Sequence, residues 1–208
     1  MSRHVILPDG RKLDFDYFIH WRPYLWRIPI AHVLDFLGDL KGRSVLHIGD
    51  FPGRLTSLLA MLGANVTMAD ITPFDDAKQE LAKWGVMDRV RLVQTSGGLS
   101  ELGTERYEVV LTKSVLWAVP NLDWFLDEID GHLGDGGKVA FVENTYGSPV
   151  AKWLRSHFRS KRFRDRESRR FGVKNGHLPL FRQKFSDVTI KTHWWMVYEI
   201  LGRKRPQA

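Results

Sequence analysis

The chain has 208 residues, of which 43% are hydrophobic and 26% charged, with a formal net charge of +7 and no cysteine. This length and composition favour a single globular domain over residues 1–208, and the lack of cysteine excludes disulfides, zinc–thiolate sites and thiol nucleophiles. No apolar run approaches the about 18 residues of a membrane-spanning helix, and the first residues lack a signal-peptide core, so we expect a cytoplasmic protein.

An aromatic segment precedes the first expected strand of the main domain. The apolar residues from Ile30 to Leu37 predict a helix, which needs only some of the preceding aromatic side chains for its own packing. These side chains are Phe15, Tyr17, Phe18, Trp21, Tyr24 and Trp26. They form either a hydrophobic cluster beneath the helix or part of an apolar cover over a small-molecule site.

Residues 44–71 predict a strand, a glycine turn, a helix and a second strand. The first strand is 45–48, Gly49 and Gly53 bracket the turn, and Gly63 ends the helix. The helix shows a leucine stripe at Leu55, Leu58, Leu59 and Leu62. This order of elements is typical of a nucleotide-type cofactor site.

Asp70 follows the second strand, 65–69, and lies roughly 20 residues after Gly49. In a doubly wound sheet, an acid at this distance can accept both hydroxyl hydrogens of a ribose. The turn itself departs from the dinucleotide pattern G-x-G-x-x-G, since Phe51 replaces the middle glycine and Pro52 lacks an N–H donor. The site therefore suits a ligand with an adenosine end and an amino-acid end better than a pyrophosphate.

The segment VLHIGDFPG (45–53) resembles the first motif, V-L-D-I-G-x-G-x-G, of the class I S-adenosylmethionine-dependent methyltransferases. His47 stands where an acid is usual and Phe51 where the central glycine is usual. The likeness continues through VRLVQTS (90–96), through 107–144 and through 185–204.

The resemblance implies an α/β, Rossmann-like methyltransferase fold with a mostly parallel seven-stranded sheet, an antiparallel last strand and helices on both faces. It implies that glycines 134, 136 and 137 form the turn before the fifth strand. It also implies that residues 1–40 form a helical lid, and that residues 149–184 are a basic insertion before the final strand pair.

S-adenosyl-L-methionine is the cofactor that the resemblance implies, held at the strand ends and by the lid. The expected contacts are His47, Gly49, Asp50, Phe51, Gly53, Asp70, Ile71, Thr95, Ser96, Thr112 and Lys113, with Tyr17 and Tyr24 from the lid. Lys113 would meet the cofactor carboxylate through a charge-assisted contact.

Methyl transfer requires an acceptor atom held in line with the sulfonium methyl, and a base only where the acceptor must lose a proton. The candidate catalytic residues are His20, Glu143 at the end of the fifth strand, and His177 in the turn-rich GVKNGHLP. A structural or solvated role is the alternative for each histidine.

Lys and Arg far outnumber the two acids, Asp165 and Glu167, between Lys152 and Lys184. Apolar residues recur at helical spacing over 150–158, which predicts a basic amphipathic helix. Three roles are open for this helix. It packs one apolar stripe on the domain and is otherwise solvated, it contacts a membrane surface over 149–164, or it binds nucleic acid.

The eight histidines form no H-x-x-x-H or H-x-H pair, so we expect no metal site. The predicted function is methyl transfer to a small-molecule acceptor that is anionic, lipid-like or a secondary metabolite. The alternatives are an RNA-directed methyltransferase that uses the basic insertion, an NAD(P)-binding oxidoreductase that uses Asp70, and a non-catalytic relative that keeps the fold.

Overall fold

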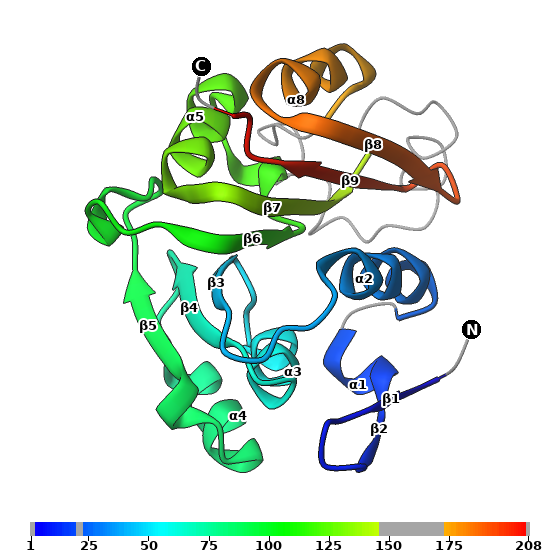
Figure 1. The fold of residues 1–208 in the computed structure, drawn as a ribbon, viewed down its shortest axis with the longest axis vertical. Coiled ribbons are helices and arrows are strands. Elements are labelled where there is room, and N and C mark those ends of the chain that lie inside the picture. The colour runs from blue at the N-terminus through cyan, green and yellow to red at the C-terminus, as the bar shows by residue number, and fades with distance from the viewer. Residues whose placement is uncertain (1–2, 20–22, 146–172, 207–208) are drawn as a thin grey trace, which may run out of the picture.

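A seven-stranded sheet organises the protein, whose computed structural model describes residues 3–19, 23–145 and 173–206 (Figure 1). The strand order is β5-β4-β3-β6-β7-β9-β8, and a separate hairpin pairs β1 with β2. The strands are β1 (His4–Ile6), β2 (Lys12–Asp14), β3 (Ser44–Ile48), β4 (Asn65–Asp70), β5 (Val90–Gln94), β6 (Tyr107–Lys113), β7 (Leu133–Asn144), β8 (Ser186–His193) and β9 (Val197–Arg203).

The α-helices are α1 (Phe15–Ile19), α2 (Pro23–Leu37), α3 (Arg54–Met61), α4 (Asp75–Trp84), α5 (Leu122–His132) and α8 (Leu178–Lys184). Short 3-10 turns lie at Met87–Arg89, Ser100–Leu102, Leu116–Ala118 and Asn175–His177. No helix among these described residues is both long and apolar enough to cross a membrane.

Strand directions match the predicted fold class. β5, β4, β3, β6 and β7 pair in parallel, and β9 runs antiparallel to both β7 and β8. The strand order reverses between β3 and β6, and ligands of such sheets bind beyond the carboxyl ends of the strands at that point. The fold therefore places the expected site where β3, β4 and β6 end.

Helices cover both faces of the sheet, as predicted. Side chains of α1, α2, α3 and α4 pack on one face in a core that includes Trp26, Leu58 and Leu81. Side chains of α5 and α8 pack on the other face with Phe141 and Leu46. Most residues of the central strands β3 and β6 are buried, because helices cover both faces of the sheet.

Helix α2 is longer than the sequence predicts, because it begins at Pro23 and not at Ile30. Pro29 lies inside the helix and removes one backbone hydrogen bond. Burial of Leu25, Trp26 and Val33 along the same helix offsets that loss, so packing overrides the helix-breaking signal.

The glycines before the fifth strand form a tight bulge inside β7, and not a turn that precedes the strand. Gly134, Gly136 and Gly137 lie within β7, where the pairing register with β6 shifts between Tyr107 and Val109. A Cβ on Gly137 would come within 2.7 Å of the Gly134 carbonyl oxygen, so the chain folds too closely on itself for a larger residue.

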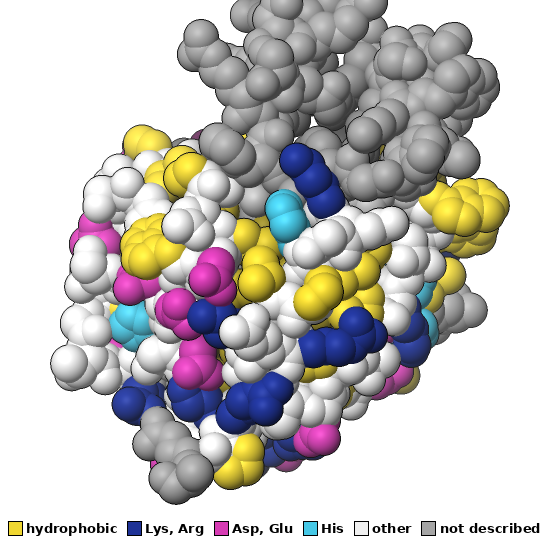
Figure 2. Space-filling model, turned by 90° about the horizontal axis from the view of Figure 1, so that it is seen from above, with side chains coloured by type: hydrophobic (Ala, Val, Ile, Leu, Met, Phe, Trp, Pro, Cys, Tyr) yellow, Lys and Arg dark blue, Asp and Glu magenta, His cyan; other side chains and the backbone are white. Residues whose placement is uncertain are grey.

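Most of the predicted basic insertion lies outside the described residues, including the amphipathic helix over 150–158 and the proposed membrane contact over 149–164. The last part of the range forms α8, which packs on the sheet. Figure 2 looks onto this side of the molecule, where Lys and Arg side chains alternate with hydrophobic ones beside a group of acidic side chains. Asp123 and Asp127 of α5 form ion pairs with Lys184 of α8.

Phe181 fastens α8 to the sheet, and its ring lies 5.0 Å from that of Phe141 in an edge-on contact. Because Phe181 is fully buried, Phe181→Ala removes packing and leaves a cavity, which we expect to lower the free energy of unfolding by about 3–5 kcal/mol. Urea unfolding measures the change. Phe51→Ala, the same substitution at a side chain that is 52% exposed, should change stability by no more than about 0.5 kcal/mol. Equal effects of the two variants would contradict the packing of α8.

Candidate functional site

The glycine turn after β3 leaves no room for side chains. Gly49 has a φ of +74°, and a Cβ there would lie 2.2 Å from Cγ2 of Val115. Gly53 has a φ of +89°, and its Cβ would lie 3.1 Å from that of Ala77 in α4. Both positions therefore require glycine, Gly49 for close approach to the loop after β6 and Gly53 for packing of α3 on α4.

Asp50 and His47 stabilise the start of α3 from below the turn. Oδ2 of Asp50 accepts a hydrogen bond of 2.6 Å from the backbone N–H of Thr56, which satisfies one of the free donors of the helix. Nδ1 of His47 lies 2.9 Å from the Thr56 hydroxyl, while Nε2 is buried without a hydrogen bond. Burial lowers the pKa of His47, so its ring is neutral near pH 7. Both residues therefore stabilise the glycine turn and the start of α3 from below the site.

A pocket of about 100 Å³ opens where β3, β4 and β6 end. Asp70 lies at its edge, and the walls are mainly apolar. The lining residues are Ile48, Gly49, Ala69, Asp70, Ile71, Thr95, Gly97, Gly98, Leu99, Val115, Ala118, Val119 and Phe125. The pocket thus combines one carboxylate with an apolar slot, an arrangement that suits a flat apolar group attached to a polar one.

One carboxylate oxygen of Asp70 accepts hydrogen bonds within the protein, and the other is available to a ligand. Oδ1 accepts hydrogen bonds from the backbone N–H and the hydroxyl of Thr72, at 2.9 and 2.8 Å. Oδ2 accepts none from the part of the chain described. The Thr72 contacts fix the orientation of the carboxylate, which leaves Oδ2 to accept from a ligand.

Glu143 holds the loop that follows β6. Its buried carboxylate accepts hydrogen bonds from the hydroxyl of Thr112 (2.8 Å) and the backbone N–H groups of Val115 and Leu116 (both 3.0 Å). Burial raises the pKa of Glu143 to about 7, although these donors act in the opposite direction. Glu143 therefore positions Val115 against the glycine turn, and Thr112 is occupied in the same network.

Lys113 lies on the opposite face of the sheet from Glu143, next to the turn. Burial lowers its pKa, and the negative charges of Asp50 and Glu143 oppose that effect. Its ammonium group is 5.4 Å from the ring centre of Trp26 in α2. Lys113 thus offers a partly desolvated cation at the strand ends.

A second pocket, of about 400 Å³, adjoins the first and shares Val119 with it. Its walls are apolar at Leu116, Leu122 and Leu180, with polar groups at one side. The remaining lining residues are Pro120, Asn121, Asp123, Lys174 and His177. The backbone N–H of Lys174 approaches Nδ1 of His177 at 3.4 Å, so in the neutral ring the proton belongs on Nε2.

A third pocket, of about 450 Å³, lies at the amino ends of the parallel strands, opposite the ends that line the first pocket. Its lining includes Ser44, Asn65 and Tyr107, which begin their strands. Since ligands of doubly wound sheets bind at the carboxyl ends, this pocket is a poor candidate for the site.

The other predicted contacts lie apart from the pockets. Tyr17 packs against the hydrophobic core, donates its hydroxyl hydrogen to Glu80 of α4 at 2.7 Å and accepts a hydrogen bond from Lys83. Tyr24 is 63% exposed and Phe51 points largely into solvent. Ser96 donates from its backbone and hydroxyl to Glu101. His20 and Trp21 lie outside the described residues.

Sequence reasoning missed the loop residues of the first pocket. These are Gly97, Gly98, Leu99, Val115, Ala118, Val119 and Phe125. The Gly97–Gly98 pair directly after the third strand was a turn signal that could have indicated part of this lining.

Residues 46–141 match the model of a methyltransferase domain family. Among solved structures, an O-methyltransferase family protein from Burkholderia thailandensis has a TM-score of 0.70 and 14% identity, over 87% of this chain and 57% of its own length. The chain thus spans somewhat more than half of that protein. No curated protein matches the sequence.

Two further similar structures contain S-adenosylhomocysteine. The N-methyltransferase NodS from Bradyrhizobium japonicum has a TM-score of 0.66 and 13% identity, over 90% of this chain and 91% of its own. The 1,6-didemethyltoxoflavin-N1-methyltransferase from Burkholderia thailandensis, which also holds 1,6-didemethyltoxoflavin, has a TM-score of 0.65 and 19% identity, over 89% and 80%. At these identities the likeness shows a shared fold.

The raised pKa of Glu143 predicts a specific pH dependence of stability. The carboxyl binds a proton more tightly in the folded than in the unfolded chain, so its contribution is complete below about pH 4.5 and is lost as the pH rises to about 7. Glu143→Gln cannot titrate. The free energy of unfolding of the wild type, relative to the variant, should therefore fall by up to about 3 kcal/mol across this window, as measured by urea unfolding at several pH values.

Glu101→Gln is the matched control, because Ser96 holds the pKa of Glu101 at about 2. Above about pH 5.5 that group is ionised in both the folded and the unfolded chain, so its variant should keep the pH slope of the wild type there. A Glu143→Gln variant with the same slope as the wild type would contradict a raised pKa.

Proposed function

We propose that the chain is a class I S-adenosylmethionine-dependent methyltransferase and that it methylates a small-molecule acceptor, which the methyltransferase-domain match over residues 46–141 and the shared fold support. The observation that carries the proposal is the arrangement of two adjoining pockets at the switch point of the sheet. One pocket has a carboxylate and an apolar slot, and the larger one has mixed walls. A cofactor pocket beside a separate acceptor pocket is what direct group transfer requires.

Asp70, Ile71 and Leu99 are the residues that would hold the adenosine end of the cofactor. Oδ2 of Asp70 would accept the ribose hydroxyl hydrogens, and the apolar walls would contact the adenine. Lys113 would approach the carboxylate of the amino-acid end, since it is a cation beside the glycine turn. Bound S-adenosylmethionine would supply an electrophilic methyl group that needs little activation by the protein.

The larger pocket would take the acceptor. Its volume of about 400 Å³ lies within the range of small-molecule sites. Leu116, Leu122 and Leu180 would contact an apolar body, while Lys174 favours a negatively charged substituent at the rim. Lys184 contributes little to this charge, because Asp123 and Asp127 already pair with it.

His177 is the candidate proton acceptor in this pocket, because its side chain lines the wall and a neutral imidazole offers a nitrogen that can accept a proton. Glu143, the other described candidate, is fully engaged with the loop after β6. We assign Glu143 a positioning role, in which it sets Val115 and Leu116 between the two pockets. His20 stays a prediction, since it lies outside the described residues.

Asp70→Asn tests the cofactor site. The amide keeps an oxygen for Thr72 but presents N–H groups where Oδ2 accepts, so two hydrogen bonds to a charged acceptor are lost, each worth about 1.5–3 kcal/mol. We expect at least about tenfold weaker binding of S-adenosylhomocysteine by calorimetry. Asp88→Asn, at the opposite edge of the sheet, removes the same charge and should leave the affinity unchanged. Equal affinities of the wild type and Asp70→Asn would overturn the assignment.

His177→Ala tests the acceptor pocket, once a tritiated-methyl screen of fractionated cell extract has supplied a substrate. If His177 removes the acceptor proton, kcat should fall about a hundredfold while the affinity for S-adenosylhomocysteine stays unchanged. Lys174→Gln should instead raise KM for an anionic acceptor, with little change in kcat. An unchanged kcat in His177→Ala would exclude the histidine as the base.

The same screen separates the small-molecule proposal from the RNA alternative, which depends on the basic residues between 152 and 184. Label in ribonuclease-sensitive material, lost steeply as salt rises, would favour RNA as the acceptor. Label in small, organic-extractable products would favour the proposal.

A further inference from the structure

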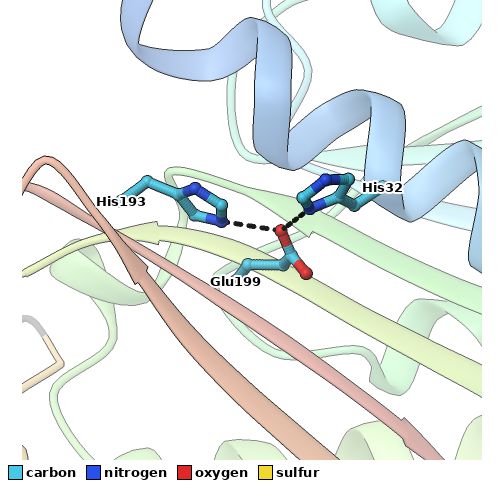
Figure 3. A group of neighbouring side chains, drawn as sticks. All are labelled: His32, His193 and Glu199. Carbon is cyan, nitrogen blue, oxygen red and sulfur yellow. Dashed lines mark hydrogen bonds and ion pairs between the residues drawn. The ribbon is translucent and has the colours of Figure 1, made fainter.

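Two histidines and a glutamate meet at a point that sequence spacing does not reveal (Figure 3). His32 comes from α2, His193 from the end of β8 and Glu199 from β9. Nδ1 of His32 lies 2.9 Å and Nε2 of His193 lies 2.7 Å from the same carboxylate oxygen, Oε2 of Glu199. The potential ligand atoms all lie within 4.8 Å of one another.

Glu199 is an unusual residue for its place in the fold. It is 0% exposed, on the face of the sheet that α2 covers, directly opposite Val142 in the pairing of β9 with β7. Its second oxygen, Oε1, accepts no hydrogen bond from the described residues, and the ammonium nitrogen of Lys191 lies 3.6 Å away from it. A buried carboxylate is costly unless it is paired or coordinates a metal, and here the partners crowd one oxygen while the other is left without a hydrogen bond.

The side chains of His193 in β8 and His32 in α2 approach this carboxylate from two sides. His193 ends β8, and Met196 N–H donates to its carbonyl oxygen across a two-residue turn of Trp194 and Trp195. Both tryptophans have positive φ, as a tight turn of this type requires. The His193 side chain is 12% exposed and that of His32 is 34% exposed, so the cluster is covered by protein but reaches solvent beside α2.

Two imidazole nitrogens and one carboxylate oxygen are a ligand set typical of zinc sites that keep a position open for water. The hydrogen bonds seen here are what such a set forms without an ion, since each neutral ring can donate one N–H hydrogen bond to the carboxylate. On binding of a metal, each ring would carry its proton on the other nitrogen and present a lone pair. Mg²⁺ prefers oxygen ligands, so the set should discriminate against it.

We propose that His32, His193 and Glu199 form a binding site for Zn²⁺ or a similar divalent transition-metal ion. The site ties α2 to the β8–β9 hairpin. In the sheet, Val142 pairs with Lys113 on one side and with Glu199 on the other, so these two residues lie two strands apart in one row, about 10 Å. Because α2 also carries Trp26, which lies over Lys113, the ion would fix the helix that covers one end of the candidate cofactor site.

Metal uptake by the full chain tests the site directly. After equilibrium dialysis against Zn²⁺ and, in parallel, Mg²⁺, elemental analysis should find about one Zn²⁺ per chain and no Mg²⁺. His32→Ala and His193→Ala should each lose the bound Zn²⁺, and the rise in Tm that Zn²⁺ gives the wild type should disappear with it. His32 is partly exposed, so its variant should fold even if substitution of Glu199 does not.

Two control variants make the test specific. His4→Ala removes an exposed histidine from β1 and should bind as much Zn²⁺ as the wild type. Lys191→Gln keeps all three ligands and removes the cation beside Oε1, so its affinity for Zn²⁺ should be equal or higher. The proposal is overturned if the wild type takes up no Zn²⁺, or if His32→Ala and His193→Ala retain it. In either case the cluster is a set of hydrogen bonds that joins α2 to the sheet.

Discussion

The hydrogen bonds to the Glu143 carboxylate are the contacts on which the arrangement of the site depends. They join the end of β7 to the loop after β6, and that loop carries Val115 against Gly49. Val119, a few residues further on, separates the two pockets. One buried carboxylate thus sets the spacing between the glycine turn, the cofactor pocket and the proposed acceptor pocket. The low dielectric around it strengthens each hydrogen bond and also makes the loss of any one expensive.

The parts of the fold that depend on local pattern could be predicted from the sequence. The strand–turn–helix–strand unit from Ser44 to Asp70 appears as expected, because apolar runs, glycines and a leucine stripe are adjacent in the chain. The pocket lining at Gly49, Asp70, Ile71 and Thr95 follows from that unit. The glycine bulge in β7 and the early start of α2 could not be predicted, since each depends on packing against distant segments.

Side-chain roles were harder to predict than positions. Glu143 was placed correctly at a strand end. Its hydrogen-bond donors lie in a loop far away in sequence, so these hydrogen bonds could not be predicted. The sequence offered Tyr17 as a lid residue because the N-terminal segment is rich in aromatic side chains; its hydrogen bond to α4 could not be inferred from that pattern, and its contact with the cofactor stays a prediction. His32, His193 and Glu199 show the same limit, since no local spacing links a helix near the N-terminus to a hairpin near the C-terminus. Only the sheet topology brings them together.

The outer strand, β8, has a consequence for how molecules of this protein meet. Its pairing register with β9 shifts between Ser186 and Thr189, and Asp187 has a φ of +51°. An irregular edge with a charged side chain interrupts the row of free backbone groups that another sheet would need for pairing. Together with the polar residues along β8, this irregularity protects the open end of the sheet from strand-to-strand aggregation.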